Sequence, residues 1–161
     1  SRARTGGQFT RVNLAGGRVQ QLVRGVQLHL RGLVQLTSRR LPPAEALYVG
    51  GEETVRGYPE GEILGDYGYA GTAELRFPIP LRIGTFRSTC TIVGFADGAA
   101  AFLRKPETGE ASKKRLIGVG LGIRWALTPH TSALVDVGWP VGNASSDGHG
   151  PRLYYAMNIG F

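Results

Sequence analysis

Residues 116–125 read LIGVGLGIRW, and the two faces of this stretch decide the fold class. One face carries large apolar side chains, which are Ile117, Val119, Leu121, Ile123 and Trp125, and the other carries three glycines and Arg124. Alternation with a period of two predicts a β-strand. A soluble sandwich rarely turns three glycines and an arginine toward its packed face, whereas a membrane barrel combines an apolar outer face with a small or polar inner face. The stretch therefore predicts an all-β fold, an antiparallel transmembrane β-barrel.

The same alternation recurs along the chain, which predicts about six or seven strands in total. The other strands are expected at residues 8–14, 26–37, 72–77, 88–102, 133–139 and 152–161. The first turn falls between Ala15 and Gly25, at a position that the pattern leaves open.

The links between these strands alternate in length. Those at residues 78–85 and 128–130 are short, whereas those at 104–114 and 142–150 are long and polar. Outer-membrane barrels have short periplasmic turns and longer extracellular loops. We therefore expect the long links outside the cell and the end of the last strand in the periplasm.

Composition excludes several other classes. The 161 residues, 42% of them apolar, indicate one folded unit, and no apolar run reaches the ~20 residues of a membrane helix. The net charge of +7 is spread along the chain without a basic helix or zinc-finger spacing, which argues against nucleic-acid binding. Catalytic motifs are missing, and His29 has no second ligand at metal-binding spacing. We expect no enzyme activity, no metal site and no cofactor.

A glycine-rich loop at residues 39–70 precedes the strand at 72–77 and contains the most distinctive motif of the chain. Its residues are Gly50, Gly51, Val55, Arg56, Gly57 and Tyr58. Downstream follow Gly-Asp at 65–66, the segment ELRFP at 74–78 and the segment GFADGA at 94–99. Long glycine-rich loops between strands of a compact domain are usually functional or disordered.

This ordered set of motifs resembles the outer-membrane transporters of two-partner secretion, of the haemolysin secretion/activation type, within the larger superfamily that includes the BamA-type assembly factors. The resemblance implies that the loop folds back into the barrel and that Arg56 meets two acidic partners, Glu74 and Asp97. An arginine fork in a confined lumen can be satisfied by such carboxylates. Arg56 would then be a latch and not a catalyst. The second acidic motif ends in Ala99, where the family has glycine.

The resemblance also implies location and partners. It places the chain in the outer membrane of a Gram-negative bacterium, surrounded by the lipid bilayer, where it would export a large partner exoprotein without nucleotide hydrolysis. The last strand would be recognised by the barrel assembly machinery through an alternating insertion signal, which consists of Tyr155, Met157, Ile159 and Phe161. Barrels of this superfamily have about sixteen strands, so residues 1–161 are expected to form the C-terminal part of a larger barrel domain.

Two other interpretations remain open from the sequence. Within the superfamily, the chain could belong to an assembly factor that inserts other barrels, or to a barrel fused to a passenger enzyme. In a different class, it could be a soluble β-sandwich binding module, in which the apolar face of residues 117–123 packs against a second sheet.

Overall fold

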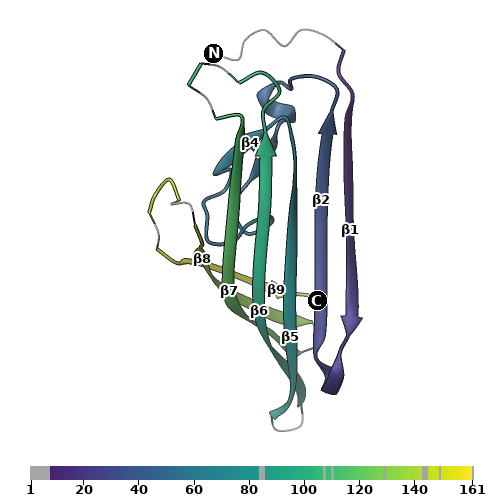
Figure 1. The fold of residues 1–161 in the computed structure, drawn as a ribbon. Helices are drawn as coiled ribbons and strands as arrows, with labels where there is room; N and C mark the ends of the chain where they lie inside the picture. The colour runs from purple at the N-terminus through teal and green to yellow at the C-terminus, as the bar shows by residue number, and fades with distance from the viewer. Residues whose placement is uncertain are drawn as a thin grey trace.

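The computed structural model describes residues 8–83, 86–106, 108–109, 111–128, 130–142, 145–148 and 150–160. It contains a seven-stranded antiparallel sheet in the order β1-β2-β5-β6-β7-β8-β9 (Figure 1). These strands are β1 (Arg11–Gln21), β2 (Gln27–Thr37), β5 (Tyr67–Ile83), β6 (Phe86–Phe102), β7 (Lys113–Thr128), β8 (Thr131–Pro140) and β9 (Arg152–Ile159). The predicted all-β antiparallel fold class is confirmed.

The sheet is curved, and its hollow side holds the long link between β2 and β5 (Figure 1). That link contains the small two-stranded sheet of β3 (Leu47–Val49) and β4 (Ile63–Gly65). Two short 3-10 helices, η1 (Val23–Gly25) and η2 (Pro43–Glu45), lie outside the sheets. No helix in the described part of the chain has the length and apolar character needed to cross a bilayer.

The core lies between the β2–β5 link and the hollow face of the sheet. The link contributes large side chains to it, namely Leu47, Val49, Val55, Tyr58 and Ile63. The sheet contributes mainly small ones, namely Ala70, Ala99, Ala101 and Leu116. Small residues on the strands let the link approach the backbone closely, so the link is packed as part of the core.

The outward face of the sheet is apolar and uncovered. Leu121 is 62% exposed and Ile117 is 52% exposed, whereas Leu116 and Gly118, which alternate with Ile117 on β7, are buried. The soluble β-sandwich would require a second sheet over these exposed side chains. No second sheet covers them in the described part of the chain, so its fold is not a sandwich, and the alternation in β7 separates a lipid-compatible face from a packed inner face.

Several strand boundaries differ from those predicted. The link expected at 78–85 is mostly strand, because β5 continues to Ile83, with Pro78 opposite Thr91 and Pro80 opposite Thr89. Prolines weaken a strand pattern in sequence, since they donate no ladder hydrogen bond. The first strand continues to Gln21, beyond the predicted end at residue 14.

The turn that the sequence left open lies at residues 22–26. The Leu22 N–H donates to the Val26 carbonyl over 2.7 Å, and Arg24 and Gly25 take positive φ values of 55° and 78°. At the other end of the sheet, β7 begins at Lys113, inside the link expected at 104–114. The short link expected at 128–130 agrees with the structure, since β7 ends at Thr128 and β8 begins at Thr131.

Candidate functional site

The motif residues form a compact turn within the β2–β5 link. The Gly50 N–H donates to Thr54 Oγ1 over 2.8 Å, and the Thr54 hydroxyl donates back to the Gly50 carbonyl over 3.0 Å. Gly50 has a φ of 119°, and a Cβ atom there would lie 2.8 Å from that of Glu62. Only glycine fits this backbone, because it has no Cβ and tolerates positive φ. Val55 and Tyr58 are then buried in the core on either side of Arg56 and Gly57.

Arg56 is held by three carboxylates from three strands. Its Nε and Nη2 donate to Asp97 Oδ2 and Oδ1 over 2.8 and 2.9 Å, which is a bidentate pair. Its Nη1 donates over 2.9 Å to Glu74 Oε1 and over 2.9 Å to Asp136 Oδ2. The Arg56 backbone N–H also donates to Asp97 Oδ2 over 3.0 Å. The guanidinium stacks 3.5 Å from the ring centroid of Phe95.

Two more arginines complete the cluster. Arg76 donates to Glu74 Oε2 from Nε over 2.9 Å and from Nη2 over 2.7 Å. Arg124 binds both carboxylate oxygens of Asp136. The cluster thus contains three arginines and three carboxylates, so it is electrically neutral when every group is ionised. Neutrality matters because an unpaired charge buried this deeply is strongly unfavourable.

The charge of Arg56 is favoured by its partners. Burial opposes ionisation of the guanidinium, but hydrogen bonds and negative charge from Asp97, Asp136 and Glu74 outweigh that effect. They raise the pKa of Arg56 above the ordinary arginine value, so this side chain stays protonated. Its exposed fraction is 2%, so screening by solvent is weak.

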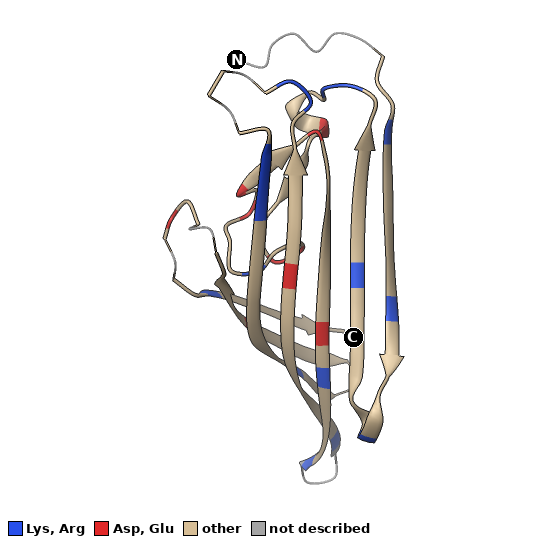
Figure 2. Ribbon diagram, viewed as in Figure 1, with Lys and Arg blue, Asp and Glu red and all other residues tan. Residues whose placement is uncertain are grey.

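Strand register places the three carboxylates on successive inward-facing levels of the sheet, each two residues from the next. Glu74 lies on β5 and Asp97 on β6, where Asp97 is opposite Thr72 of β5 and Gly118 of β7. Asp136 lies on β8, opposite Gly122 of β7. Figure 2 shows one acidic band on β5 and one on β6, at different heights, with a basic band directly below the acidic band of β5.

Glycines on β7 make room for this arrangement. A Cβ atom on Gly118 would overlap the Arg56 carbonyl oxygen, and one on Gly122 would overlap the Asp136 carboxylate. The loop therefore packs against the inner face of residues 116–125, where the side chains are small. A strand with ordinary side chains at these positions would exclude Arg56 from the site.

The structure brings Arg56 of the motif together with Glu74 and Asp97. It adds four residues that were not predicted to belong to the site, which are Arg76, Arg124, Asp136 and Tyr154. In the strand predicted at 133–139, Asp136 lies on the polar face, whereas Val135 and Val137 lie on the apolar face. That alternation was the signal that could have identified Asp136.

The predicted insertion-signal residues lie apart from the cluster. Tyr155, Met157 and Ile159 are on the outward face of β9, with exposed fractions of about 60–80%. Phe161 lies outside the described residues.

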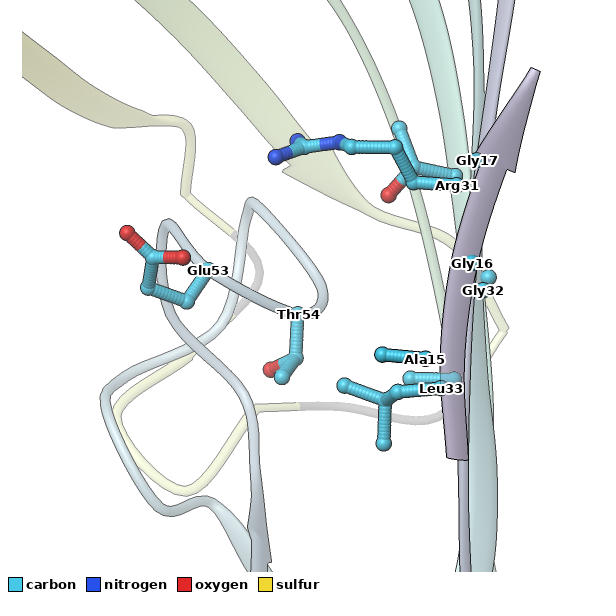
Figure 3. Close-up of a pocket in the computed structure, with 11 residues that line it drawn as sticks. Ala15, Gly16, Gly17, Arg31, Gly32, Leu33, Glu53 and Thr54 are labelled. Carbon is cyan, nitrogen blue, oxygen red and sulfur yellow. The ribbon is translucent and has the colours of Figure 1, made fainter. Parts of the chain in front are cut away.

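A pocket of about 430 Å³ separates the loop from β1 and β2. Figure 3 shows Glu53 and Thr54 on the loop side and Ala15, Arg31 and Leu33 on the strand side. Beside Glu53 and Thr54 the loop thus leaves space on the side of β1 and β2.

The cluster can hold a loop in place, but its carboxylates are all paired with arginines. Each carboxylate accepts hydrogen bonds from at least one arginine, which leaves no activated base or nucleophile in the cluster. Within the described ranges, no group of three or more His, Cys, Asp or Glu side chains is arranged to hold a metal ion.

A family model described as the Omp85 superfamily domain matches residues 5–161. No curated protein matches the sequence.

Proposed function

The chain belongs to the Omp85 superfamily, and from that premise we propose that it is part of a two-partner secretion transporter, which exports a large partner exoprotein. Members of the superfamily are outer-membrane proteins of Gram-negative bacteria or organelles, and they transport or assemble proteins. Their barrels act in transport or assembly and not in catalysis. The proposal adds the type of transporter and its substrate class.

The open sheet supports a role as the C-terminal part of a larger barrel domain. In the described part of the chain, β1 and β9 are the two edges of the sheet and each pairs with one neighbour. Backbone groups on an open edge have no hydrogen-bond partners inside a bilayer, so a membrane sheet must close. Additional strands next to β1 and β9 would complete the barrel.

The Arg56 cluster is the observation that carries the proposal. It fixes a loop inside the hollow of the sheet through strands β5, β6 and β8, and so it acts as a latch. A latched loop partly fills the lumen, while the pocket beside β1 and β2 stays open. In the proposed mechanism the latch stabilises the barrel conformation from which export starts, and folding of the exoprotein outside supplies the driving force.

The test is export by an Arg56→Ala variant of the full-length protein, measured as the amount of exoprotein in the medium. We expect export to be abolished while the variant remains in the outer membrane, because the alanine leaves three buried carboxylates without their shared cation. Arg82→Ala is the matched control, since Arg82 lies near the far end of β5 and outside the cluster.

Normal export by Arg56→Ala would overturn the proposal. The assay also separates export from assembly. If the variant instead lowers the amounts of unrelated outer-membrane barrels, the chain belongs to an assembly factor of the same superfamily.

A further inference from the structure

The side chain of Tyr154 joins the last strand to the motif loop. Tyr154 lies on the inner side of β9, between Leu153 and Tyr155, which point outward. Its hydroxyl oxygen accepts a hydrogen bond from the Gly57 N–H over 3.0 Å. The same hydroxyl donates to the Tyr58 carbonyl over 3.1 Å. One phenol group therefore fills both hydrogen-bonding roles toward the backbone that directly follows Arg56.

Close packing against β8 makes this contact possible. Gly57 has a φ of 99°, and a Cβ atom there would lie 2.6 Å from the Trp139 carbonyl carbon. A Cβ atom on Gly138 would lie 2.7 Å from the Gly57 nitrogen. The two glycines bring the loop backbone within reach of the neighbouring strand, and Tyr154 holds it there.

A second contact attaches the loop to the hairpin formed by β8 and β9. The Ser146 N–H donates to Glu62 Oε1 over 2.9 Å, and the Ser146 hydroxyl donates to Glu62 Oε2 over 2.7 Å. Ser146 lies in the link between β8 and β9, and Glu62 lies in the link that contains the motif. On the opposite side the loop faces the pocket beside β1 and β2. Residues 57–62 of the loop are thus attached toward β8 and β9, whereas Arg11 of β1 and Gln35 of β2 bond the same link farther along, at Glu45 and Asp66.

From this geometry we propose that Tyr154 is a positioning residue that couples the motif loop to β9. Release of the loop and loosening of the edge strand are then linked, because one hydroxyl is bonded to the loop and is carried by the strand. The inference deepens the proposed function, since it adds a second partner to the latched loop. It assigns the loop a role in holding the strand at which the barrel would close.

The first experiment is hydrogen exchange, followed by mass spectrometry, on the full-length protein in lipid. In Tyr154→Phe we expect about tenfold faster exchange in the peptide that contains Gly57, since two hydrogen bonds are lost and packing is kept. Tyr155→Phe is the matched control, because it removes a hydroxyl from the outward side of the same strand, and there we expect unchanged exchange in the loop.

The second experiment tests the coupling itself. Arg56→Lys keeps the charge but loses the arginine fork, so it weakens the latch without touching β9. We expect it to speed exchange in residues 153–157 when Tyr154 is present, and to add nothing in the Tyr154→Phe background.

Three results would overturn the inference: unchanged loop exchange in Tyr154→Phe, a uniform rise across all strands, or unchanged exchange in β9 after Arg56→Lys. None of these measurements involves the exoprotein. Normal export by Arg56→Ala would contradict the proposed function and leave the coupling standing, so the two failures are distinguishable.

Discussion

At the scale of single residues, the site depends on one buried cation with three anions around it. Burying charges is expensive unless each is paired and hydrogen-bonded, and the bidentate contact between Arg56 and Asp97 meets that condition. Asp136 has a double role, because it binds Arg56 and also binds Arg124. Removing its charge would leave the cluster with a net positive charge.

We therefore expect Asp136→Asn to lower the free energy of unfolding by about 3 kcal/mol, since it breaks a buried ion pair. The measurement is urea-induced unfolding of the full-length protein from lipid vesicles. Asp147→Asn is the control, because Asp147 pairs with Arg152 at the surface, and exposed pairs contribute under about 1 kcal/mol. Equal effects of the two substitutions would show that Asp136 is not part of a neutral buried cluster.

At the scale of elements, β7 is a strand against which the loop packs. Its outward positions are large and apolar, while its inner positions include Gly118, which the loop backbone contacts directly. The matching elements on the other side are the tight turn at Gly50 to Thr54 and the small strands β3 and β4, which give the loop a fixed shape. The loop packs as part of the core because it has a fixed shape and β7 leaves room for it.

A pair of glycine substitutions tests this fit. Gly118→Ala places a methyl group against the Arg56 carbonyl, and overpacking of this kind costs about 1–3 kcal/mol. We expect a lower melting temperature and faster proteolysis within residues 39–70. Gly98→Ala changes the neighbouring strand, where the added atom meets nothing within 4 Å, and should leave both quantities near the wild-type values. Similar losses in the two variants would mean that the loop does not rest on Gly118.

At the scale of the whole molecule, the sheet has an apolar outward face and a polar cluster within its hollow. Leu121 lies in the middle of β7 and Leu81 near one end of β5, and both side chains are exposed on the outward face. In water, such a surface would favour aggregation. In a bilayer it is the expected contact with lipid.

Leu121→Arg tests that orientation. A charge facing the middle of the bilayer costs about 2–4 kcal/mol, and the cost falls to about 0–1 kcal/mol near the interface. We expect Leu121→Arg to destabilise the folded protein in vesicles by the larger amount and Leu81→Arg by the smaller. Equal costs at the two positions would place Leu121 away from the centre of the bilayer.

The sequence by itself determined the fold class and the two faces of the strands, and its resemblance to a known family implied the contact of Arg56 with Glu74 and Asp97. Strand alternation is a local property, and a shift of one residue would turn every side chain to the wrong face, so the pattern at 116–125 is readable without a structure. The ordered motif carried the resemblance that pointed to the loop. Strand boundaries were harder to predict where prolines or lysines interrupt the alternation, as in β5 and β7.

Only the tertiary structure decided which other residues join the site. Asp136 is 80 positions from Arg56, and Tyr154 is 97 positions from Gly57. Their meeting depends on how far the sheet curls and on how closely glycines let the loop approach β8. Alternation tells which way a side chain points, but the distance across a hollow sheet is set by the packing of all its strands together.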